Sequence, residues 1–212
     1  FEQFAEIISK DAGLSAKILQ IANSPAFRQW QEITDLRRVL IVFGMRDLKT
    51  IVTTCAVEQF FSQFSTTFNH QVRRIWIRSI CCANLCERLA QLLGYHKPGE
   101  AFLAGLLHQA GMLILMSHSG EDYLQLLDSY DDAPHSFSRK ERALFQIDHC
   151  EMGALLVHGW KLDSFLAEAI RFQRSTLVEL RNAPVLLKIL AVAADFADSH
   201  NLLELSLIHI SE

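Results

Sequence analysis

Apolar residues recur along most of this chain at the three- and four-residue spacing of a buried helix face, and alternation with a period of two is scarce. The most apolar stretch, residues 101–116, reads AFLAGLLHQAGMLILM. A helix that is apolar on nearly every face belongs in the middle of a core, so we predict one buried helix there. His108 and Gln109 lie inside this stretch, and each needs a hydrogen-bond partner to offset the cost of burial.

The same pattern predicts further helices joined by short connections. We expect them at residues 1–9, 14–23, 33–43, 46–62, 68–93, 121–129, 139–148, 149–160, 164–172 and 184–199. Gly44 and Gly94 are placed to end helices, and Pro184 to begin one. Residues 131–137 are predicted to form a loop, followed by a capping box that starts at Ser138. Since the chain has only 9 Gly and 4 Pro, the prediction is an all-α, compact bundle of about ten or more helices.

No Pro- or Gly-rich linker divides the chain, so we predict a single domain over residues 1–200. Within it, residues 1–65 are expected to form an N-terminal helical subdomain and residues 66–200 the main core. Residues 201–212 are treated as a tail of undetermined origin. Because the chain opens at Phe1 within an apparent helix, we expect it to be a fragment.

The charge and cysteine content narrow the class of protein. Lys and Arg number 20 against 24 Asp and Glu, which gives a net charge of −4 and argues against nucleic acid or an anionic membrane as an obligatory partner. No signal peptide is visible, and no apolar run approaches the roughly 20 residues of a membrane span. The five cysteines lack disulfide-type spacing, so we expect reduced thiols and a cytoplasmic location.

Few residues are candidates for chemistry. The chain has no serine in a Gly-flanked elbow and no glycine-rich phosphate loop. His108, His149 and Asp195 occupy apolar helical stretches, and inward-facing His and Asp side chains are one way to build a divalent metal site. The alternative is that each is a hydrogen-bonded core or capping residue. The pattern alone leaves both interpretations open.

Several segments together resemble the HDOD family, a degenerate branch of the HD superfamily of helical, metal-dependent phosphohydrolases. The similarity covers nearly the whole chain, to about Asp198. It is carried by Asp-Ala-Gly-Leu at 11–14, Ile-Ala-Asn-Ser at 21–24, the segment 39–44, Gly-Leu-Leu-His-Gln-Ala-Gly at 105–111, Asp-His-Cys-Glu-Met-Gly at 148–153, and Trp160. Each segment is weak alone, and their order and spacing are specific.

The resemblance implies which positions an HD enzyme would use. Such an enzyme has a histidine on the long helix, a His-Asp doublet on the buried helix and a late aspartate. These positions correspond here to Arg78, to His108 with Gln109, and to Asp195, while Gln173 stands where a histidine pair is common. Arginine has no lone pair for a metal and glutamine is a weak replacement for aspartate, so we expect no metal, no cofactor and no catalytic residue. We further predict that Arg78 pairs with Asp195 in a buried network with His108 and Gln109.

The function implied by the resemblance is a non-enzymatic signalling or regulatory module of a bacterial cytoplasm. Its partners would be proteins of a signalling pathway or flanking domains such as GGDEF or EAL, in cyclic di-GMP or two-component signalling. Arg74 and Arg78, one helical turn apart, are candidates for binding a small anionic ligand, with His149 and Gln173 as further pocket positions. Two alternatives stay open: a phosphohydrolase with one metal on His108, Asp195 and His149, and a structural scaffold or dimer.

Overall fold

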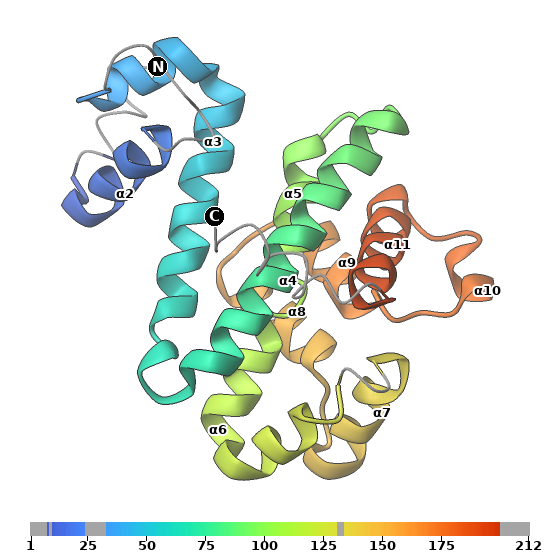
Figure 1. The fold of residues 1–212 in the computed structure, drawn as a ribbon. Coiled ribbons are helices and arrows are strands. Elements are labelled where there is room, and N and C mark those ends of the chain that lie inside the picture. Colours follow the sequence, from blue (N-terminus) through green and yellow to red (C-terminus); the bar gives the residue numbers. More distant parts are fainter. Residues whose placement is uncertain (1–7, 9, 24–32, 131–133, 200–212) are drawn as a thin grey trace. The chain divides into compact units, whose positions relative to one another are not determined.

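The computed structural model describes residues 8, 10–23, 33–130 and 134–199 (Figure 1). In these residues helices make up the fold and no strand occurs, which confirms the all-α prediction. The helices are α2 (Ala12–Ala22), α3 (Leu36–Ser62), α4 (Ser65–Leu92), α5 (Pro98–Leu107), α6 (Ala110–Leu127), α7 (Pro134–Phe145), α8 (His149–Gly159), α9 (Ser164–Arg171), α10 (Leu177–Leu180) and α11 (Val185–Ser199). The chain forms two compact units, Phe1–Phe60 and Phe61–Glu212, each considered by itself below.

In the first unit, side chains at both ends of α2 fix its limits. The Asp11 carboxylate accepts a hydrogen bond from the Leu14 amide at 2.9 Å, which caps the N-terminus. At the other end the Asn23 side chain donates to the Ile33 carbonyl and accepts from the Ile33 amide, both at 2.8 Å. Asn23 therefore holds the chain that enters α3 against the end of α2.

Gly44 interrupts α3 as the sequence predicts. Its φ of 75° and ψ of 173° are not helical, and glycine adopts this conformation without the strain that a Cβ would cause. The helical segments on either side pack with α2 in the core of the first unit, which includes Ile18 from α2 and Val39, Leu48 and Cys55 from α3.

In the second unit, α4 and α5 pack very closely. A Cβ added to Gly105 would lie 2.6 Å from the Ala83 Cα, so only glycine permits this approach. Gly94 follows α4 with a φ of 67°, which confirms the predicted glycine at the helix end. The close approach buries Cys82, Cys86 and other α4 side chains completely.

The prediction of one buried helix over residues 101–116 is wrong. Two helices meet there, because α5 ends at Leu107 and α6 begins at Ala110. The turn lets α5 pack against α4 while α6 packs against α8, which a single straight helix would not do. The predicted burial is confirmed, since His108 and Gln109 have 0% exposed surface. By length and hydropathy the described residues offer one candidate membrane span, Pro98–Leu127, but 78% of its most apolar window is buried inside this unit.

Several further helix boundaries differ from the predictions. Helix α7 begins at Pro134, so residues 134–137 are not loop and no capping box opens at Ser138; proline is well suited to a first helical position. The capping box lies instead between Thr176 and Glu179, where it starts the unpredicted α10. Helix α11 begins at Val185, so Pro184 precedes it. The helix predicted at 1–9 falls almost entirely outside the described residues.

Candidate functional site

A buried polar network in the second unit is centred on the hydroxyl of Tyr130, which follows the C-terminal end of α6. This hydroxyl accepts hydrogen bonds from Gln109 Nε2 at 2.7 Å and from Arg174 Nη2 at 2.8 Å. It donates to Asp198 Oδ1 at 2.8 Å. The network therefore joins the α5–α6 turn, the segment after α9 and the end of α11.

Two arginines surround Tyr130. Arg174 Nη1 lies 2.5 Å from Asp198 Oδ2, and these side chains are only 13% and 1% exposed. The guanidinium of Arg78 lies over the Tyr130 ring, 4.7 Å from its centroid. Burial raises the pKa of Tyr130 above its usual range, so its hydroxyl stays neutral and remains a hydrogen-bond donor.

Gln173 fastens the segment after α9 to the α5–α6 turn. Its Nε2 donates to the His108 carbonyl at 2.8 Å and to the Ile170 carbonyl at 3.1 Å. The His108 ring is bonded within its own helix, through Nδ1 to the Gly105 carbonyl at 2.7 Å. In the part of the chain that is described, His108 Nε2 and the side-chain oxygens of Gln109 and Gln173 have no hydrogen-bond partner.

Asp195 is not the buried aspartate of α11. It is exposed, and the inward carboxylate belongs to Asp198, three residues later. The predicted buried pair of Arg78 and Asp195 assumed a core position for residue 195, and this premise is wrong. Asp198 follows the buried Ala191 and Ala194 at helical spacing, so the periodicity of α11 contained the signal.

His149 belongs to a separate buried cluster. Its Nδ1 lies 2.6 Å from Glu141 Oε2, and its Nε2 lies 3.4 Å from the Cys150 sulfur. Tyr123 donates to the other Glu141 oxygen at 2.6 Å. The Phe137 ring contacts both clusters, with centroids 4.8 Å from the Tyr130 ring and 6.0 Å from the His149 ring. The structure thus does not bring His149 into the Tyr130 network.

The Glu141–His149 contact is a fully buried ion pair, because both side chains have 0% exposure. Burial by itself lowers the pKa of His149. The neighbouring Cys150 sulfur and Glu141 carboxylate outweigh burial and raise the pKa well above its usual range. We assign this cluster a structural role, since it joins α6, α7 and α8 and none of its polar groups reaches the surface.

The side chains of the Tyr130 network are not suitable ligands for a divalent metal. Guanidinium groups have no lone pair to give, and both Asp198 oxygens face cationic or hydroxyl donors. Across the described residues, no group of three or more His, Cys, Asp or Glu side chains is placed to hold a metal ion. Arg74 is half-buried one turn before Arg78, and its predicted role in ligand binding stays a prediction.

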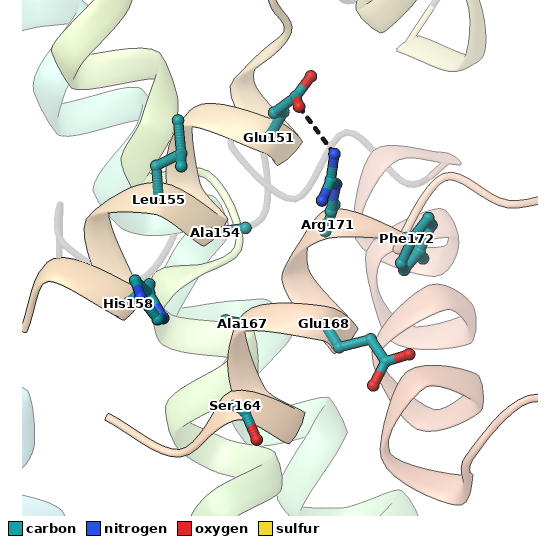
Figure 2. A pocket seen from close by; sticks show the side chains of 9 residues that line it. All are labelled: Glu151, Ala154, Leu155, His158, Ser164, Ala167, Glu168, Arg171 and Phe172. Atoms are coloured by element: carbon teal, nitrogen blue, oxygen red, sulfur yellow. Dashed lines mark hydrogen bonds and ion pairs between the residues drawn. The ribbon is translucent and has the colours of Figure 1, made fainter. Parts of the chain in front are cut away.

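Two surface grooves flank α9. The α8–α9 groove, of about 380 Å³, has Ala154 and Ala167 among its lining residues (Figure 2). Figure 2 shows Arg171 reaching Glu151 across this groove, at 2.9 Å. A second groove, of about 500 Å³, lies between α9, the beginning of α11 and the α4–α5 connection. We call it the α9–α11 groove. Glu168 lines both.

Comparison with known proteins gives one matching family model, the HDOD domain, over residues 1–176. An HDOD domain protein of unknown function from Geobacter sulfurreducens is 25% identical with a TM-score of 0.76, over 92% of this chain and 65% of that one. A candidate phosphohydrolase from Shewanella amazonensis SB2B is 27% identical with a TM-score of 0.75, over 99% of this chain and 76% of that one. These matches confirm the resemblance predicted from the sequence.

A more distant solved structure shares the fold, and a curated protein is similar in sequence. The MmoQ response regulator of Methylococcus capsulatus str. Bath is 22% identical with a TM-score of 0.53, over 93% of this chain and 77% of that one. An uncharacterized protein of Treponema pallidum (strain Nichols) is 22% identical over 196 residues, which are 91% of this chain and 36% of that protein. The chain therefore spans about a third of the Treponema protein and 65% of the Geobacter chain.

Proposed function

The chain belongs to the HDOD family, and from this premise we propose that it is a non-enzymatic signal-transduction module. In this proposal it acts in a bacterial cytoplasm by binding a protein partner or a flanking signalling domain. Cyclic dinucleotide and two-component pathways are the settings we propose for it. The response-regulator name of one relative supports signalling, and the phosphohydrolase name of another supports the alternative.

The observation that carries the proposal is the pairing of Arg174 with Asp198 beneath the Tyr130 hydroxyl. A divalent cation in this network would have to displace a guanidinium from the buried carboxylate. It would also face the positive charge of Arg78, which lies over the Tyr130 ring. Like charges in a buried region repel strongly, so we propose that the metal chemistry of the HD enzymes does not operate here.

Metal analysis combined with a turnover assay tests the proposal. The purified chain is dialysed against manganese, iron or zinc, and its metal content and hydrolysis of bis(4-nitrophenyl) phosphate are measured. We expect sub-stoichiometric metal and no turnover above a buffer blank. Near-stoichiometric metal with turnover, both abolished in His108→Ala, would contradict the proposal and establish a phosphohydrolase.

The phosphohydrolase alternative would need a ligand set other than the one predicted. His149 is enclosed in the Glu141 cluster, and Asp195 is exposed. The specific observation in its favour is the buried His108 Nε2, which finds no hydrogen-bond partner in the described residues. If His108 and Asp198 hold a metal together, then Asp198→Asn abolishes metal uptake as completely as His108→Ala.

A small anionic ligand at Arg74 and Arg78 is a further part of the proposal. Two guanidinium groups one helical turn apart suit a phosphodiester, because each presents planar donors. Calorimetric titration with cyclic di-GMP tests this idea, with Arg74→Ala as the variant and Arg88→Ala, an exposed arginine later on α4, as the control. Heat of binding lost only in Arg74→Ala supports the ligand, and no heat in the unaltered chain refutes it.

A further inference from the structure

The α9–α11 groove is walled by large apolar side chains that water reaches. Leu93 is 64% exposed, Phe165 is 61% exposed and Val185 is 48% exposed. They come from three separate parts of the second unit, yet they line one depression of about 500 Å³. Single exposed apolar residues are ordinary on protein surfaces, whereas a gathered set around a hollow is typical of an interaction site.

Of the charged side chains that line this groove, some are paired with one another and Glu168, within the residues described, is not. Lys97 lies 3.6 Å from Glu100, and Glu100 also accepts the Tyr95 hydroxyl at 2.7 Å, so these groups satisfy one another. Glu168 forms no ion pair within the described part of the chain. Figure 2 shows its carboxylate extending away from Arg171 and Glu151. The groove therefore presents one carboxylate without a cationic partner beside an apolar surface.

The α8–α9 groove, on an adjacent face of α9, differs in this respect. Its arginine, Arg171, already closes on Glu151 at 2.9 Å, and its lining combines two alanines with the exposed Leu155 and Phe172. An incoming group would have to break that ion pair to reach the charges. Glu168 lines both grooves, but the α9–α11 groove is the better docking surface, because Glu168 and the apolar walls can be reached there without breaking the Arg171–Glu151 pair.

We propose that the α9–α11 groove binds a short amphipathic helix of a partner protein. Apolar side chains one helical turn apart would pack on Phe165, Leu93 and Val185, and a lysine or arginine would pair with Glu168. A hollow of this size accepts a few side chains rather than a domain, and a carboxylate at its edge repels nucleic acid and favours a basic segment. The inference rests on the proposed function and names the chemistry of its protein partner.

Peptide display tests this inference without knowledge of the partner. A library of random 15-residue peptides is selected on the immobilised full chain, and enriched peptides are titrated by fluorescence anisotropy. The same titrations use Phe165→Ala and Glu168→Lys. Matched controls are Leu144→Ala, an equally exposed leucine on α7, and Glu121→Lys on α6. Circular dichroism verifies that each variant keeps its fold.

We expect enriched peptides to carry Lys or Arg three or four residues from an apolar pair. Their affinity should fall at least about tenfold in Phe165→Ala and in Glu168→Lys, and stay unchanged in both controls. No enrichment, or binding insensitive to Phe165 and Glu168, overturns the inference. Light scattering that shows a dimer in the unaltered chain and a monomer in Phe165→Ala also overturns it, since the occupant is then a second copy.

The result is separable from the test of the proposed function. If the chain binds no peptide and also shows no metal and no turnover, only the proposed role of the groove is refuted. Metal-dependent turnover refutes the non-enzymatic role, whichever peptides bind.

Discussion

Replacing Gly111 with alanine should destabilise the second unit, because the added methyl group meets the main chain of α8. Gly111 lies where α6 crosses the beginning of α8. An added Cβ would lie 2.6 Å from the Gly153 nitrogen and 2.9 Å from the His149 carbonyl carbon, and closer still to the carbonyl oxygen. Ordinary contact begins at 3.4 Å, and each obstacle is main chain, so no side chain can rotate away.

The cost follows from the separation of two packed helices. Moving α6 away from α8 loosens contacts of fully buried side chains such as Met112, Leu113 and Val157. Overpacking of a rigid core costs about 1–3 kcal/mol and occasionally more, and main-chain obstacles place this variant at the upper end, at about 3 kcal/mol. For a chain of this size that corresponds to a fall in Tm of roughly 6–12 °C.

Gly99→Ala is the matched control, because it adds the same methyl group to α5 at a position with nothing within 4 Å. Alanine has less conformational freedom than glycine in the unfolded chain, so this variant should gain about 0.4–1 kcal/mol in the free energy of unfolding. Thermal and urea unfolding followed by circular dichroism measure both variants. Equal Tm values for Gly111→Ala and the unaltered chain, or losses of similar size in both variants, would refute the packing argument.

Three other predictions concern the buried polar groups. Tyr130→Phe removes the hydroxyl that three side chains share, and should cost about 1–3 kcal/mol in urea unfolding; a loss below about 0.5 kcal/mol would mean that the network contributes little. Arg174→Ala leaves the buried Asp198 carboxylate without its guanidinium and should lower the free energy of unfolding by about 3–5 kcal/mol. Arg171→Ala breaks an exposed pair and should lower it by at most about 1 kcal/mol. Losses of similar size in the two variants would contradict the burial of the Arg174–Asp198 pair. The pKa of His149 is raised in the folded chain, so protonation of this side chain stabilises the fold fully below the ordinary pKa of about 6.5. That stabilisation is lost as pH rises through the raised pKa, and Tm should therefore fall as pH rises. Glu141→Gln should flatten this pH profile by lowering Tm most at acidic pH, and an unchanged profile would show that the pair does not control it.

Much of the helical fold was predictable, because half-buried helices carry a clear three- and four-residue period. Gly44 and Gly94 marked real interruptions, since their positive φ values favour glycine. The break between α5 and α6 was not predictable in the same way. A segment buried on all sides has no polar face, and without one the pattern does not show where the chain changes direction.

The candidate site was predictable only in part. Burial of His108 and Gln109 followed from polar residues in an apolar stretch. The choice of Asp195 over Asp198 missed the face of α11 that turns inward. Tyr130 and Arg174 follow the ends of helices, where no periodic pattern shows which way a side chain points. That these two side chains meet could therefore be seen only in the folded structure.

The bond between Tyr130 and Asp198 has a consequence for the order of events during synthesis. The two residues are 68 positions apart, and the same hydroxyl also serves Gln109 and Arg174. Until residue 198 has emerged from the ribosome, the growing chain holds these donors without the carboxylate that they meet in the folded unit. The second unit therefore cannot complete this buried network before α11 has been made, and we expect a nascent chain that stalls earlier to lack its full core.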